Sequence, residues 1–227
     1  MLEKLLKANQ HNFHPVLPYQ DEKIIHFDLS IHNKELYNID VSSAVKLSKY
    51  LHKKLVSANA NVGVGGYQED RILYRKSKHF GEGDDARTIH LGIDIWMNEN
   101  TPVFAPLDGE IHSFYNNDIF GDYGPTIILK HQLENTIFYT LYGHLSLSSL
   151  QLLEVGKFIR KGEKFCELGN KNENGNWPPH VHFQVIKDMF GKKGDFPGVT
   201  NQQEKEKYFN NCPDPNLILN LDVLRKI

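Results

Sequence analysis

The clearest periodic pattern in the first third of the chain lies in residues 41–58. Its apolar positions recur every three or four residues and are Ala44, Leu47, Leu51 and Leu55. This spacing places them on one face and predicts an amphipathic helix. Asp40, Ser42 or Ser43 precedes the pattern and can accept the free amide hydrogens of the first turn.

The segments on either side of this helix lack such a period. Residues 1–40 read as irregular and contain Pro15 and Pro18. Residues 58–67 are rich in glycine and other small residues, which is typical of a loop. We therefore expect residues 1–80 to form a partly helical N-terminal extension that contains one amphipathic helix.

From about residue 88 the chain changes to short apolar or alternating runs separated by Gly-, Asn- and Asp-containing turns. The runs are 91–96, 102–105, 110–114, 126–130, 136–142, 164–168 and 181–186. Strands at this spacing, with no helical pattern between them, predict a mainly β fold with an antiparallel sheet or sandwich. We place this β domain at residues 81–190. Residues 191–227 then form a C-terminal tail that packs on it, with a short helix within 217–227.

Composition narrows the class of protein. The chain has 227 residues, of which 40% are hydrophobic and 24% charged, as expected of a globular protein. A net charge of −2 gives no reason to expect a nucleic acid partner. No run approaches the ~18 apolar residues of a membrane span, and the first residues do not resemble a signal peptide. A cytoplasmic location is therefore expected, unless a leader has been removed. The oligomeric state is left open.

Twelve histidines are present, and the placement of a few suggests chemistry. His90 and Asp94 are four residues apart, so they share a face in either a strand or a helix. An imidazole and a carboxylate on one face can converge on a metal ion. His180 and His182 alternate with apolar residues and therefore share one face of a strand. His144 follows an apolar run, where a strand is expected to end.

Together these residues have the composition of a catalytic zinc site. Such a site usually takes three His or carboxylate ligands and keeps a fourth position for water. Neighbouring imidazoles can accept the proton of that water or stabilise a developing oxyanion. Two histidines and one aspartate can serve as ligands, which leaves two histidines for proton transfer and charge stabilisation.

The pair His90 and Asp94, then His144, then the pair His180 and His182 occur in this order along the chain. This order of motifs resembles that of the lysostaphin-type, LytM-like zinc endopeptidases of metallopeptidase family twenty-three. His90 and Asp94 match the family's His-x-x-x-Asp motif, and His180 with His182 matches its His-x-His motif. The family's intervening histidine is matched by His144. The resemblance extends to residues 102–111, 141–145 and 155–163 and covers about residues 86–187.

The resemblance implies that His90, Asp94 and His182 bind one zinc ion and that His144 and His180 form the catalytic pair. It also implies antiparallel sheets that form a groove with the zinc ion at its floor. Family members typically cut peptides in bacterial cell walls. The Asn-Trp-Pro-Pro approach to His180 departs from the usual Gly-Pro approach, so Trp177 and Pro178 are expected to change the wall of the groove.

We therefore expect a zinc metallopeptidase that cleaves peptidoglycan-type peptides. Two alternatives are an intracellular zinc hydrolase of a small amide or ester, and a binding module without catalytic activity. Arg87, Tyr142 and Trp177 are candidates for the walls of the groove. Asn61 or His79, from the N-terminal extension, is a candidate for the open zinc position.

Overall fold

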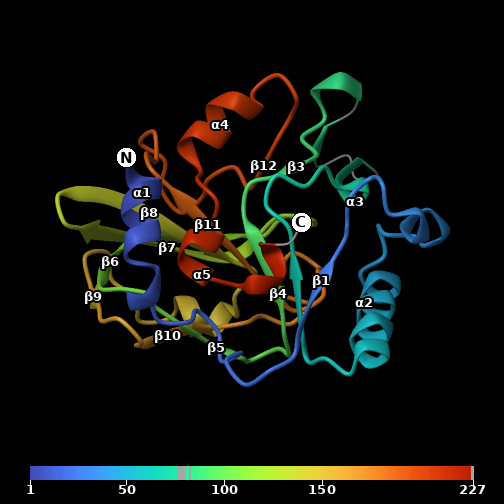
Figure 1. The fold of residues 1–227 in the computed structure, drawn as a ribbon, viewed down its shortest axis with the longest axis horizontal. Coiled ribbons are helices and arrows are strands. Elements are labelled where there is room, and N and C mark those ends of the chain that lie inside the picture. The colour runs from blue at the N-terminus through green and yellow to red at the C-terminus, as the bar shows by residue number, and fades with distance from the viewer. Residues whose placement is uncertain (76–79, 82, 226–227) are drawn as a thin grey trace.

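The computed structural model describes residues 1–75, 80–81 and 83–225, and its main element is an eight-stranded sheet (Figure 1). In spatial order the strands are β1 (Ile24–Phe27), β2 (Val62–Gly65), β4 (Ile93–Trp96), β11 (His180–Ile186), β8 (Thr136–Gly143), β7 (Gly124–Leu133), β6 (Gly109–Asn117) and β9 (Phe158–Ile159). Strands β1 and β2 are parallel, whereas the other pairs of described strands are antiparallel. The predicted mainly β class is confirmed, with a mixed rather than purely antiparallel sheet.

Two small antiparallel sheets complete the β structure. One pairs β5 (Pro102–Phe104) with β10 (Lys164–Glu167). The other pairs β3 (Ile89–His90) with β12 (Val199–Thr200). The second pairing brings the C-terminal part of the chain next to the first candidate ligand, because Val199 lies opposite His90.

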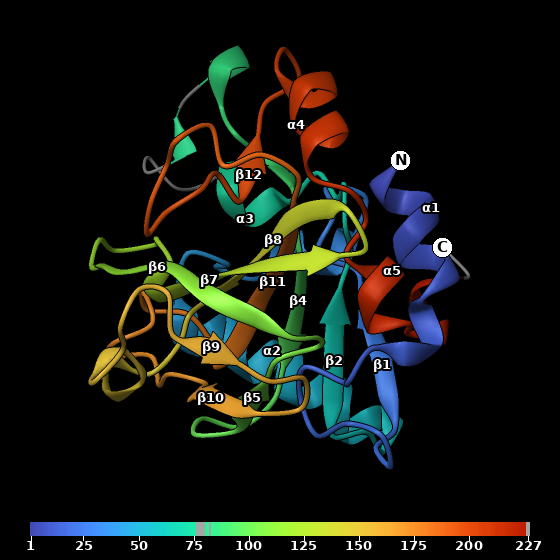
Figure 2. The ribbon, with the colours of Figure 1, turned by 90° about the vertical axis from the view of Figure 1, so that its left-hand side faces the viewer.

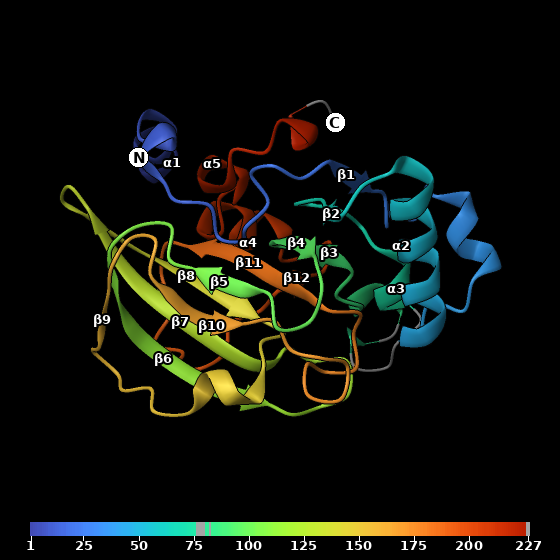
Figure 3. The same ribbon diagram turned by 90° about the horizontal axis from the view of Figure 1, so that it is seen from below.

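The predicted amphipathic helix is α2 (Ala44–Ala58), and its position is confirmed. The Ser43 side chain caps it by accepting a hydrogen bond from the Lys46 amide. Ala44, Leu47 and Leu51 are buried, and Figure 3 shows the helix alongside β1 and β2.

The expected loop at residues 58–67 is wrong, because Val62–Gly65 is the buried strand β2. Its glycines have a packing role. A Cβ atom at Gly63 would lie 2.0 Å from the Phe27 ring, so the absence of a side chain lets the aromatic ring lie against the backbone. Residues 1–40 are also more regular than expected, since they contain α1 (Leu2–Ala8) and β1.

The C-terminal tail contains α4 (Lys205–Asn211) and α5 (Asn216–Leu219). Figures 1 and 2 show α5 beside α1, so the two ends of the chain meet on one side of the sheet. The remaining α-helix is α3 (Ile72–Arg75), which follows β2. No helix within the described residues is long and apolar enough to cross a membrane.

Candidate active site

Three separate strands supply the residues of a buried polar cluster. His90 ends β3, Asp94 lies in β4 and His182 lies in β11. In the antiparallel β4–β11 pair Asp94 is directly opposite His182, and directly opposed residues project to the same face of a sheet. All three are almost completely buried. The pairing of β4 with β11 thus joins two motifs that are 88 residues apart in the chain.

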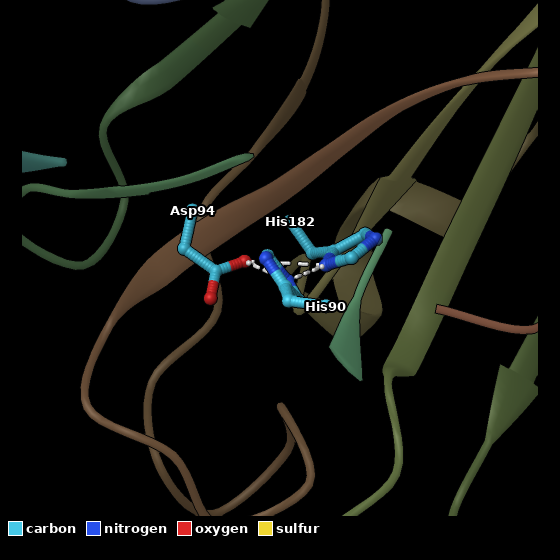
Figure 4. Close-up of side chains that lie close together, drawn as sticks. All are labelled: His90, Asp94 and His182. Atoms are coloured by element: carbon cyan, nitrogen blue, oxygen red, sulfur yellow. Dashed lines mark hydrogen bonds and ion pairs between the residues drawn. The ribbon is translucent and has the colours of Figure 1, made fainter. Parts of the chain in front are cut away.

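The polar atoms of this cluster form a small triangle (Figure 4). His90 Nε2 lies 2.9 Å from His182 Nδ1 and 3.3 Å from Asp94 Oδ1. The third side, from His182 Nδ1 to Asp94 Oδ1, is 3.2 Å. Nitrogen ligands at ~2.0–2.1 Å from a tetrahedral zinc ion lie about 3.3 Å from one another. The three atoms therefore have the spacing of a zinc ligand set.

The hydrogen bonds on the far sides of the two imidazoles define where their protons are. His90 donates from Nδ1 to the Gly66 carbonyl at 3.1 Å. His182 donates from Nε2 to Gln184 Oε1 at 2.8 Å, and the Gln184 amide is oriented by its own donation to the Pro197 carbonyl. Each neutral imidazole has one N–H, so the two nitrogens that face each other carry lone pairs.

Two lone pairs and a carboxylate oxygen within 3.3 Å of one another repel unless a cation lies among them. Burial, together with the nearby positive charge of Arg71, lowers the pKa of His90 to about 3, so its imidazole is neutral at pH 7. Burial opposes ionisation of Asp94, but its polar neighbours, among them the permanently charged Arg71, hold its pKa well below the usual range. The donor set therefore fits one zinc ion.

A glycine permits this close packing. Gly92 lies between β3 and β4, and a Cβ atom there would lie 2.6 Å from the His182 ring. His90 and Asp94 do not lie in one continuous strand, because the chain is interrupted between β3 and β4.

His144 and His180 lie beside the cluster. His144 follows β8 with a left-handed backbone conformation (φ of 62°), and His180 begins β11. Their ring centroids are 4.2 Å apart, and His180 Nε2 lies 3.9 Å from Asp94 Oδ1. Burial lowers the pKa of both, so both imidazoles are neutral at pH 7.

Each of these histidines donates from Nδ1 to a backbone carbonyl, which leaves Nε2 as the acceptor. The partners are the carbonyls of Asn174 for His144, at 2.9 Å, and of Pro178 for His180, at 2.7 Å. Trp96 stacks on His180 with an interplanar angle of 19°. The two rings are therefore held with their proton-accepting nitrogens free for reaction.

A cavity of about 160 Å³ adjoins four of the five residues, all but His90. The candidate ligands Asp94 and His182 line it, as do both members of the expected catalytic pair. Its other walls come from the N-terminal extension, including Arg71 and Tyr74, and from residues 195–199. Segments outside the central β region thus complete the walls of the site.

Of the three expected groove residues, Arg87 and Trp177 line this cavity, whereas Tyr142 does not. Tyr142 is fully buried in the core, where its ring contacts Phe165 and Phe183. The Asn61 amide donates instead to Glu22, and His79 lies outside the described residues.

Sequence reasoning missed two residues that hold the ligands. Gln184 continues the alternation of His180 and His182 on β11, so the same period could have found it. Arg71 binds Asp94 from a segment without a motif, and no sequence signal pointed to it.

Comparison with known proteins agrees with this geometry. The profile of Peptidase family M23 matches residues 88–195. A protein of Haemophilus influenzae named as an uncharacterized metalloprotease is 33% identical over 95 residues, which are 42% of this chain and 18% of that protein. This chain thus matches less than a fifth of the length of that relative.

Two solved structures are also similar. The catalytic domain of the antimicrobial peptidase lysostaphin from Staphylococcus simulans is 24% identical, with a TM-score of 0.37, over 53% of this chain and 80% of that one. A zinc containing peptidase from Vibrio cholerae is 24% identical, with a TM-score of 0.36, over 49% and 30%. The similarity to the family rests on the profile and on the Haemophilus relative. Residues 88–195, slightly less than half of the chain, match peptidase family M23.

Proposed function

We propose that this chain is a zinc-dependent metallopeptidase whose single zinc ion is bound by His90, Asp94 and His182. The observation that carries the proposal is the triangle of two imidazole lone pairs and one carboxylate oxygen, with sides of 2.9, 3.2 and 3.3 Å. The match of residues 88–195 to a peptidase family supports it, as does the name of the Haemophilus relative.

A zinc ion held by His90, Asp94 and His182 would supply a Lewis acid that polarises a carbonyl and lowers the pKa of a bound water. His144 and His180 then provide the proton transfer. Each is neutral, with Nδ1–H bonded to a carbonyl, so Nε2 can accept a proton from the attacking water. Once protonated, the same nitrogen can donate to the oxyanion or to the leaving amine.

Peptidoglycan-type peptides are the first substrate class to test. The support is the match of all five expected site residues to the motifs of lysostaphin-type enzymes. A second candidate is a small amide or ester hydrolysed in the cytoplasm. The observation that favours it is the small cavity, whose walls include Leu29 and Leu47 as well as residues 195–199. A long peptide needs an open groove, whereas a small molecule does not.

The test is metal analysis coupled to a substrate screen. We expect one zinc ion per chain and hydrolysis that a chelator abolishes and added zinc restores. The screen compares muropeptides, glycine-rich peptides of increasing length and small amides. Preference for the muropeptides or longer peptides supports the peptidase, and preference for the small amides supports the second candidate. Stoichiometric zinc without hydrolysis of any of them would contradict both and favour a binding module.

A further inference from the structure

Arg71 is a fully buried cation next to the proposed zinc site. Its side chain is 1% exposed, and a charge at such a position requires charged or hydrogen-bonding partners. Nη1 donates to Asp94 Oδ2 at 2.5 Å and to the Tyr74 hydroxyl at 3.2 Å. Nε donates to Glu69 Oε2 at 2.7 Å. The guanidinium therefore joins Asp94 to the N-terminal extension.

The two oxygens of Asp94 have different partners. Oδ2 is bound by Arg71, whereas Oδ1 faces His90 Nε2 and His182 Nδ1. We propose that Arg71 is a positioning residue that orients the Asp94 carboxylate so that Oδ1 alone faces the metal. This inference rests on the zinc site proposed above. Because Arg71 lies outside residues 88–195, the part of the chain that matches the family does not supply it.

The surroundings of Arg71 hold it rigidly. Glu69 binds Arg71 through Oε2 and accepts a hydrogen bond from the Leu29 amide through Oε1 at 2.9 Å. On the other side Gly65 lies opposite Asp94 in the β2–β4 pair. A Cβ atom at Gly65 would lie 2.7 Å from Arg71 Nη2, so the glycine leaves space for the guanidinium. A planar, rigid donor in such a place constrains the carboxylate that it binds.

Arg71 can affect zinc affinity in two opposite ways, by orienting the Asp94 carboxylate and by its positive charge. The positive charge of Arg71 by itself repels a zinc ion and withdraws electron density from Asp94. Hydrogen bonding to a ligand carboxylate orients it, and the loss of such a partner typically costs 10–100-fold in metal affinity. If orientation dominates, then both the removal of Arg71 and its replacement by lysine weaken zinc binding. If charge dominates, removal strengthens binding and lysine leaves it unchanged.

The experiment measures the zinc dissociation constant by competition with a chromogenic chelator. We expect Arg71→Met and Arg71→Lys each to raise it by about 10–100-fold. Arg75→Met is the matched control, because Arg75 ends α3 and pairs with Asp70 rather than with the site. We expect it to change the constant less than ~2-fold. Tighter binding by Arg71→Met, or unchanged binding by Arg71→Lys, overturns the inference. A wild-type chain that binds no zinc would instead overturn the proposed function.

A double-mutant cycle separates positioning from a general effect on folding. Arg71→Met leaves two buried carboxylates without their cation, which can prevent folding, so the cycle uses Arg71→Lys and Asp94→Glu, which keeps a carboxylate ligand but moves it relative to Arg71. If Arg71 acts through Asp94, Arg71→Lys causes little further loss of zinc affinity once Asp94 is replaced. An equal loss in both backgrounds would show that Arg71 acts on the fold and not on the ligand.

Discussion

A comparison of two buried histidine sites, at His131 and at the cluster of His90, Asp94 and His182, shows one difference. At the far end of β7, His131 is 1% exposed and both of its ring nitrogens have protein partners. Nδ1 donates to the Asp108 carbonyl at 2.9 Å, and Nε2 is hydrogen-bonded to the Thr140 hydroxyl at 2.7 Å. In the cluster of His90, Asp94 and His182, by contrast, two lone pairs face each other.

This difference teaches how to separate a structural histidine from a functional one. Burial does not distinguish the two sites, since it lowers the pKa of both His131 and His90. What distinguishes them is the partner of each ring nitrogen. Both nitrogens of His131 have a protein hydrogen-bond partner that complements them, whereas the facing nitrogens of His90 and His182 need a cation between them. Three predictions test this comparison.

The largest effect is expected from removal of a ligand in the cluster. His182→Ala removes one corner of the triangle, so we expect zinc content to fall from about one ion per chain to near zero. Hydrolysis should be lost with it. His131→Gln is the matched control, because it alters an equally buried histidine and should keep the zinc. Equal zinc content in wild type and His182→Ala would refute the assignment of the metal site.

A smaller effect is expected beside the cluster. His144→Ala removes a proton acceptor but none of the three metal-facing atoms. We expect zinc content to stay at the wild-type level while kcat falls about 10²–10⁴-fold. Metal analysis and steady-state kinetics on the same sample measure both. Loss of zinc together with activity would make His144 a ligand instead.

The smallest effect concerns stability at the His131 site. Burial lowers the pKa of His131 to about 4, whereas an unfolded chain titrates near ~6.5. The unfolded state therefore binds more protons between these values. The stability present above pH ~6.5 is lost as the pH falls, by at most about 3 kcal/mol.

His131→Gln should reduce this pH dependence, because glutamine offers a donor and an acceptor but does not titrate. Chemical unfolding of both proteins at pH 7, 6 and 5 measures the difference in slope. The other histidines are common to both proteins and cancel. Parallel slopes would mean that His131 binds protons equally in the folded and the unfolded states.

The predictable part of the fold lies where local pattern and final environment agree. The runs 126–130 and 136–142 became β7 and β8, because short stretches of β-branched and aromatic residues between turns favour buried strands. The helix at Ala44–Ala58 was equally clear. Strand β2 was not, because its Val-Gly-Val-Gly sequence depends on side chains packed against its glycines, namely the rings of Phe27 and Trp96 and the guanidinium of Arg71.

The sequence by itself determined the mainly β class and named His90, Asp94, His144, His180 and His182, because short-range spacing sets which side chains share a face. Tertiary structure alone brought Asp94 opposite His182. It determined which nitrogen of His90 and His182 carries the proton, through hydrogen bonds to Gly66 and Gln184. It also placed Arg71 on Asp94. These contacts join distant segments, and no local pattern records them because they depend on strand pairing and on the exclusion of water from the site.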